Sequence, residues 1–184
     1  MILSIDPGVN FCGFSLSYKK NDAIHIKKSV LIKTIRRYNE EEKEMERIYG
    51  SRVMKIFDII KVMNDLISEF KIEKIVVESP FYSYMTPQAY GSLLEVIFAI
   101  KYMIAIPNKI EIVYLEPLLI KKLFSNEHQA SKIMMRDFLI RKVEEQEIVF
   151  DFDINLDDLS EHEVDAISVG FVYFKLPERR VENQ

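Results

Sequence analysis

Two acidic residues each end a short apolar run with the composition of a buried strand. Asp6 follows the apolar residues 2–5, and Glu78 ends the run "KIVVE". A third acid, Asp165, lies in the apolar segment "VDAISVGFVYF", three residues after His162. Because the carboxyl ends of adjacent parallel strands form one edge of an α/β sheet, binding sites lie there. If the two strands are neighbours, Asp6 and Glu78 meet at that edge.

Each of these side chains has an ordinary explanation when it is taken alone. Asp6 precedes Pro7-Gly8, and Asp-Pro-Gly is a common turn sequence because proline fixes φ and glycine tolerates positive φ. An aspartate early in a helix complements the helix dipole. Together, however, three carboxylates and a histidine cannot all stay charged side by side without a cation. Oxygen-rich ligands of this kind suit Mg²⁺ or Mn²⁺.

The charge of the chain is unevenly distributed. The net charge is −4, which at first argues against a nucleic-acid partner. Ten acidic residues and no lysine or arginine lie between Glu144 and Asp165, so the rest of the chain is basic. A basic body with one acidic segment is compatible both with phosphate binding and with a cation site.

Length and composition predict one globular domain. The chain has 184 residues, of which 48% are hydrophobic and 29% charged, so we expect a single domain over residues 1–176 and a polar tail over 177–184. The single cysteine, Cys12, is expected to be a buried side chain. We expect no signal peptide and no membrane span, because the apolar start is short and no run of 18 apolar residues occurs. A cytoplasmic protein, compatible with a viral origin by its isoleucine and lysine content, is therefore expected.

The pattern of apolar residues predicts an α/β fold. Alternating or continuous apolar runs predict five strands, at residues 2–5, 11–18, 23–32, 74–79 and 109–117. Helical spacing predicts five helices, at residues 40–70, 91–106, 118–124, 126–143 and 160–174. Ser160 and Glu163 form a capping box that places the start of the last helix. This order predicts a five-stranded mixed sheet, three antiparallel strands and then parallel ones, flanked by helices.

Four segments resemble one nuclease family. The segments "SIDPGVNFCGFS", "VVESPF", "KKLFSNEHQASK" and "HEVDAISVG" occur in the order and spacing of the RuvC-type Holliday junction resolvases. The chain is similar to this family over about residues 1–174, which implies an RNase H-like fold. The family's catalytic, metal-binding positions fall on Asp6, Glu78, His162 and Asp165. The resemblance implies two Mg²⁺ ions, for which Mn²⁺ can substitute, with Asp6 bridging both.

The resemblance also implies contacts with DNA. Phe81 falls at the position of an aromatic side chain that stacks on a base. Lys121 and Lys132 fall on two family lysines, and Lys132 would neutralise the scissile phosphate during catalysis. For both lysines the alternative is a solvated helix face. Arg136, one turn after Lys132, would extend this basic track. Further tyrosines could stack on unpaired bases: Tyr82, Tyr84 and Tyr90.

The function implied is that of a crossover junction endodeoxyribonuclease. Such an enzyme hydrolyses two symmetrically related phosphodiester bonds of a four-way junction, one metal ion activating water and the other stabilising the leaving 3′ oxygen. A two-fold substrate suits a homodimer. The apolar helix 91–106 is the expected interface, unless it is simply sandwiched within one subunit.

Other functions remain open at this point. A related nuclease could act on flaps, forks or RNA instead of junctions. A non-catalytic junction-binding protein is a second alternative, although it would be expected to have lost a carboxylate. An actin-like nucleotide-binding domain also opens with a strand and a glycine turn, but it would need more glycine-rich phosphate loops than five glycines allow.

Overall fold

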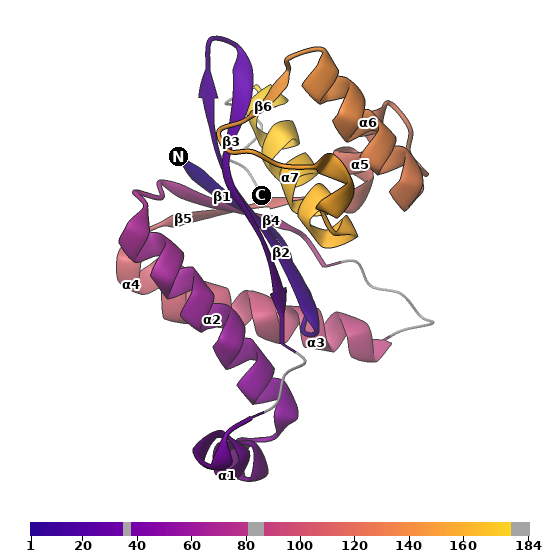
Figure 1. Cartoon of the computed structure of the whole chain (residues 1–184). Helices are drawn as coiled ribbons and strands as arrows, with labels where there is room; N and C mark the ends of the chain where they lie inside the picture. The colour runs from indigo at the N-terminus through magenta and orange to yellow at the C-terminus, as the bar shows by residue number, and fades with distance from the viewer. Residues whose placement is uncertain (35–37, 81–86, 178–184) are drawn as a thin grey trace.

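The computed structural model describes residues 1–34, 38–80 and 87–177. Its centre is one mixed sheet with the strand order β5-β4-β1-β2-β3-β6 (Figure 1). The strands are β1 (Ile2–Asp6), β2 (Phe11–Lys20), β3 (Ala23–Lys33), β4 (Lys74–Glu78), β5 (Glu111–Leu115) and β6 (Ile148–Phe150). The first three strands form an antiparallel meander, and β4 and β5 continue the sheet in parallel from β1. The predicted α/β architecture is confirmed.

The predicted number of strands is wrong by one. The sheet has six strands because β6 pairs in parallel with β3, with Ile148 opposite Ile24. A three-residue strand between acidic residues is too short to show a period in the sequence. Side chains of β2 and β3 contact Asp151, the residue directly after β6. Tyr18 Oη donates to Asp151 Oδ2 at 2.9 Å, and His25 Nδ1 lies 2.9 Å from Asp151 Oδ1.

The β2–β3 hairpin forms where the sequence predicts it. Asn21 and Asp22 both have positive φ, 50° and 64°, which is the requirement of a type I′ turn that matches the twist of the two strands. Cys12 is completely buried on β2, and burial raises the pKa of its thiol far above the usual range. The expectation of a core cysteine is confirmed.

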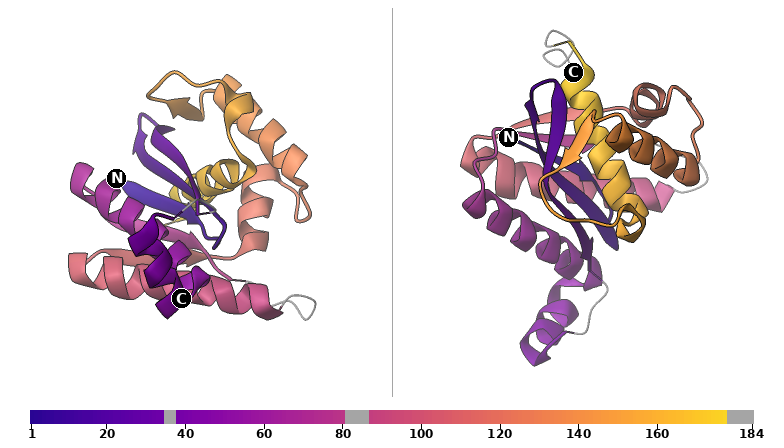
Figure 2. Two further views of the ribbon diagram at one scale, coloured as in Figure 1. Left: turned by 60° about the horizontal axis from the view of Figure 1, so that its bottom comes forward. Right: turned by 45° about the horizontal axis from the view of Figure 1, so that its top comes forward.

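Helices cover both faces of the sheet (Figures 1 and 2). One core lies between the sheet and α2 (Ser51–Glu69), α3 (Pro87–Ala99) and the π-helical segment η1 (Ile100–Ala105). The second core lies under α5 (Pro117–Ser125), α6 (Lys132–Glu144) and α7 (Glu161–Lys175). The remaining helical segments are α1 (Glu40–Tyr49), α4 (Ile106–Asn108) and the 3-10 turn η2 (Leu156–Asp158).

The single helix predicted over residues 40–70 is two helices. Gly50 lies between α1 and α2 with φ 87°, a conformation that glycine adopts without strain. Asn39 and Glu42 form a capping box at the start of α1. No residue of α1 is buried, and the helix extends away from the body of the protein (Figure 1). Its polar surface explains why the apolar pattern begins only in α2.

The apolar helix predicted over 91–106 is part of a longer rod, α3–η1–α4. Val96, Ile100 and Ile104 face the sheet and are buried. The opposite side exposes about half of each large side chain: Phe98, Tyr102, Met103 and Ile106. The expectation that a partner subunit covers this side stays a prediction. By length and composition this rod could cross a membrane, yet core helices of globular layers pass the same test. The expectation of no membrane contact stays a prediction.

Helix α7 crosses β1 and β2 unusually closely at two glycines. A Cβ atom at Gly13 of β2 would lie 1.9 Å from the carbonyl oxygen of His162. A Cβ atom at Gly170 of α7 would lie 2.8 Å from Ser4 Oγ. Small residues on both elements therefore let the first turn of α7 lie against the end of β1, where Asp6 is.

We expect Gly13→Ala to destabilise the protein by about 1–3 kcal/mol, because the added methyl group meets backbone that cannot rotate away. Gly91→Ala is the matched control. A Cβ atom at Gly91 meets nothing within 4 Å, so this helical substitution should raise stability by up to about 1 kcal/mol. Denaturant unfolding of both variants measures the difference, and equal free energies of unfolding would contradict the close crossing.

Candidate active site

Asp6 and Glu78 lie side by side at the carboxyl edge of the sheet. Strands β1 and β4 pair in parallel with Ile5 opposite Val77, so the next residue on each strand is an acid. Residues in equivalent positions on parallel neighbours point to the same face of the sheet. The structure therefore brings together the two acids that the sequence placed at strand ends.

The turn after Asp6 is held in a defined shape. Thr34 Oγ1 donates to the carbonyl oxygen of Val9 at 2.5 Å. A Cβ atom at Gly8 would lie 2.2 Å from the carbonyl oxygen of Phe11, so the glycine allows the chain to fold tightly back into β2. The Pro-Gly turn thus leaves the carboxylate of Asp6 at the rim of the sheet.

The start of α7 adds the next two side chains to the site. Ser160 Oγ accepts from Glu163 N, and the Glu163 carboxylate accepts from Ser160 N, which confirms the predicted capping box. One turn of helix then places His162 and Asp165 on the same face. His162 Nδ1 lies 2.7 Å from Asp6 Oδ2. The residues of β1, β4 and α7 thus converge on Asp6.

The electrostatics of the site are those of crowded carboxylates. Burial, together with the charges of Asp6 and Asp165, raises the pKa of Glu78 to about 8, and the positive charge of Lys121 opposes this rise. Burial and the charge of Asp6 raise the pKa of Asp165 to about 6, against the positive charge of Lys132. The charge of Asp6 thus makes ionisation of both Glu78 and Asp165 more costly, in addition to the cost of their burial.

His162 is oriented from two directions. Its hydrogen bond to Asp6 raises the pKa of the imidazole. Its ring stacks on Phe11 of β2, with the two centroids 5.6 Å apart and the planes 10° apart. While Nδ1 faces Asp6, the Nε2 atom lies 3.6 Å from Glu161 Oε1.

These side chains fit a divalent cation by their chemistry. Within the described residues, no three His, Cys, Asp or Glu side chains are drawn together closely enough to bind a metal ion as they stand. Mutual repulsion keeps ionised carboxylates apart when no cation is between them. The oxygen donors of Asp6, Glu78 and Asp165 nevertheless suit Mg²⁺, and burial together with the charge of Asp6 raises the pKa values of Glu78 and Asp165, so a bound cation would favour their ionised forms.

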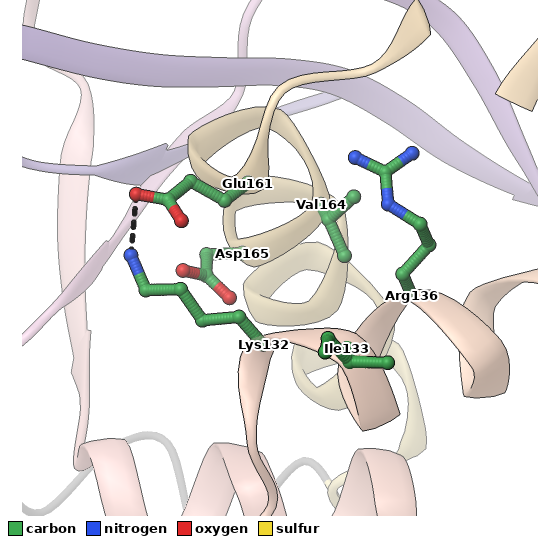
Figure 3. Close-up of a pocket in the computed structure, with 6 residues that line it drawn as sticks. All are labelled: Lys132, Ile133, Arg136, Glu161, Val164 and Asp165. Atoms are coloured by element: carbon green, nitrogen blue, oxygen red, sulfur yellow. Dashed lines mark ion pairs between the residues drawn. The ribbon is translucent and has the colours of Figure 1, made fainter. Parts of the chain in front are cut away.

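Two lysines border the carboxylates. Lys132 is the first residue of α6, after the N-cap Ser131. Its Nζ atom lies 2.5 Å from Glu161 Oε1, in the pocket shown in Figure 3. Lys121 lies in α5, close enough to Glu78 to act on its pKa. Both lysines therefore lie near acids of the site, and their predicted contacts with DNA stay predictions.

The guanidinium group of Arg136 does not lie beside the ammonium group of Lys132, as a continuous basic surface would require. Its guanidinium donates to the carbonyl oxygens of Leu156 and Leu159, and in Figure 3 it lies apart from Lys132. The side chain thus holds the segment that leads into α7. Its proposed contact with DNA remains a prediction, but the structure gives it a positioning role that i, i+4 spacing alone does not reveal.

Some site residues were missed and others cannot be placed. Glu161 and Phe11 were not identified from the sequence; Glu161 could have been noticed, because the capping box makes it the first residue of α7. The stacking of Phe11 on His162 depends on tertiary structure. Tyr90 lies in α3. Three aromatic residues with predicted roles in DNA binding lie outside the described residues: Phe81, Tyr82 and Tyr84.

No family model and no curated protein sequence matches the chain. Solved structures do match it over most of its length. RuvC of T. thermophilus, solved in complex with a Holliday junction substrate, has a TM-score of 0.61 at 14% identity, covering 94% of this chain and 92% of that one.

Two further structures are similar to a comparable extent. The yeast mitochondrial Holliday junction resolvase Ydc2 has a TM-score of 0.64 at 13% identity, with 95% and 78% of the two chains covered. The fowlpox virus resolvase, solved with Holliday junction DNA, has a TM-score of 0.56 at 14% identity, with 95% and 99% covered. The chain therefore has the fold of the RuvC-type Holliday junction resolvases.

Proposed function

We propose that this protein is a metal-dependent, structure-selective DNA endonuclease that resolves Holliday junctions by paired symmetric cuts. The observation that carries the proposal is the convergence of Asp6, Glu78 and Asp165 on one edge of the sheet, with the pKa values of Glu78 and Asp165 raised. Such a cluster needs a cation when it is ionised. The resolvase fold supports branched DNA as the substrate.

Each residue of the site has a separate task in this reaction. Asp6, Glu78 and Asp165 would hold the Mg²⁺ ions, with Asp6 shared between them. When bound, the ions would activate water and stabilise the leaving 3′ oxygen. His162, held by Asp6 through Nδ1, would take up or release a proton at Nε2.

The basic side chains would hold the DNA backbone. Lys132 extends from the N-terminus of α6, where the helix dipole also favours an anion. Its ammonium group would neutralise the scissile phosphate, while Lys121, whose charge acts on Glu78, would position the strand. Positive side chains next to the carboxylates would support hydrolysis of a phosphodiester bond.

We expect Asp6→Asn to lower the rate of junction cleavage in Mg²⁺ by about three orders of magnitude, since loss of a metal ligand costs several kcal/mol of transition-state stabilisation. The measurement is cleavage of a synthetic four-way junction, with binding followed separately. Asp158→Asn is the control, because it removes the same charge from an exposed residue of η2 and should leave cleavage unchanged.

The same assay separates the alternatives. Symmetric paired nicks support resolution, whereas equal cleavage of flaps, forks or RNA would keep the nuclease and discard the resolvase. Binding of the junction by the wild type without cleavage, in Mn²⁺ as well as Mg²⁺, would favour the non-catalytic junction-binding protein.

The raised pKa values predict how stability depends on pH without metal. The folded-state pKa values, about 8 for Glu78 and about 6 for Asp165, lie above the ordinary 4.5 and 3.8. The folded state therefore binds more protons than the unfolded state. The extra bound protons stabilise the folded state fully below about pH 4. This stabilisation is lost as the pH rises through about 6 and then about 8, and it is on the order of a few kcal/mol in total. The raised pKa of His162 acts in the same direction.

We therefore expect the Tm of the protein in EDTA to fall between about pH 5 and about pH 9, and Mg²⁺ to raise the Tm more at the higher pH, where the carboxylates are ionised. Thermal unfolding with EDTA and with Mg²⁺ measures both effects. Glu78→Gln should flatten the pH dependence. An equal rise in Tm on addition of Mg²⁺ at about pH 5 and at about pH 9 would contradict metal binding by these groups.

We propose a homodimer formed through the outer side of the α3–η1–α4 rod. Phe98 and Tyr102 stack on each other, with centroids 6.0 Å apart, although each is about half exposed. Arg52 of α2 pairs with Glu95 of α3 at 3.0 Å, and next to it α2 exposes Val53. Two adjacent helices thus expose large apolar side chains, which a second copy related by a two-fold axis would cover.

We expect the double variant Phe98→Glu/Tyr102→Glu to be monomeric, because two like-charged pairs would be buried at the centre of the interface. Analytical ultracentrifugation should give twice the chain mass of 21.7 kDa for the wild type and the single mass for the variant. Leu118→Glu, on an exposed position of α5, is the control and should leave the dimer intact. A monomeric wild type would refute this interface.

A further inference from the structure

The N-termini of α6 and α7 meet beside the carboxylates, and the first residues of the two helices pair. Lys132 Nζ lies 2.5 Å from Glu161 Oε1 (Figure 3). The same oxygen lies 3.6 Å from His162 Nε2. Glu161 thus joins Lys132 to the histidine that contacts Asp6. It is not one of the acids that the metal site requires.

The pair is exposed and therefore easily exchanged. The side chain of Lys132 is 61% exposed and that of Glu161 is 47% exposed. Ion pairs this accessible to water contribute little to stability. A carboxylate oxygen on the lysine ammonium has the charge and hydrogen-bonding geometry of a phosphate oxygen. Glu161 therefore occupies, relative to Lys132, the place where a backbone phosphate would bind.

We propose that Glu161 is an affinity-determining residue that competes with the DNA backbone for Lys132. The inference rests on the proposed nuclease function and adds a residue to it. DNA would have to break the Lys132–Glu161 pair before its phosphate reached the ammonium group, so the enzyme would bind its substrate and its product less tightly than its lysines allow. A weaker hold on product favours release after cleavage.

Neighbouring acids do not share this arrangement. Asp165 lies in the same pocket, but burial and the charge of Asp6 dominate its electrostatics. Asp158 is exposed in η2, and its carboxylate makes no ion pair with a cation of residues 1–34, 38–80 or 87–177. Asp158→Asn therefore removes one negative charge near the site without freeing a lysine, which makes it the matched control.

The test is a double-mutant cycle on DNA affinity in EDTA, where cleavage cannot occur. Binding of a fluorescent four-way junction at low salt is measured for the wild type, Glu161→Gln, Lys132→Gln, the double variant and Asp158→Asn. We expect Glu161→Gln to lower the Kd about two- to fivefold, as loss of an exposed ion pair allows. In the Lys132→Gln background the same change should alter the Kd no more than Asp158→Asn does.

Two results would overturn the proposal. A higher Kd for Glu161→Gln would mean that the glutamate presents Lys132 to the DNA instead of competing for it. An equal decrease with and without Lys132 would mean that only the general charge matters. Absence of DNA binding by every variant, the wild type included, would refute the nuclease proposal itself, so the two failures are distinguishable. Thermal unfolding of each variant confirms that it is folded.

Discussion

The close crossing of α7 over β2 is the contact on which the site depends. Without a side chain at Gly13, the backbone at His162 lies directly on the strand, and the first turn of α7 reaches Asp6 at the end of β1. A larger residue would push the helix off the strand, because its Cβ atom would lie 1.9 Å from the carbonyl oxygen of His162. The site is therefore built by backbone contact as much as by its side chains.

Charge imposes the second constraint. Burial and the charge of Asp6 raise the pKa of both Glu78 and Asp165. Lys132, Glu161 and His162 form a chain of polar contacts along the rim of this cluster. Binding of a cation would therefore relieve the repulsion between carboxylates that the fold brings together.

The two faces of the sheet serve different purposes. On one face α5, α6 and α7 cover the second core and carry the lysines and the last acid of the site. On the other, the α3–η1–α4 rod is apolar on both of its sides, and only its inner side is covered. This asymmetry places a candidate subunit interface and the candidate active site on separate helices.

Local patterns in the sequence determined the five main strands, the start of α7 at Ser160 and the acids at strand ends, because periodicity and capping act within a few residues. The sequence also contained Gly50 and Glu161, but their consequences were not recognised. Tertiary structure alone decided the pairing of β6 with β3, the hydrogen bonds of Arg136 to the segment before α7, and the stacking of Phe11 on His162. These contacts join residues far apart in the chain, and no local period encodes them.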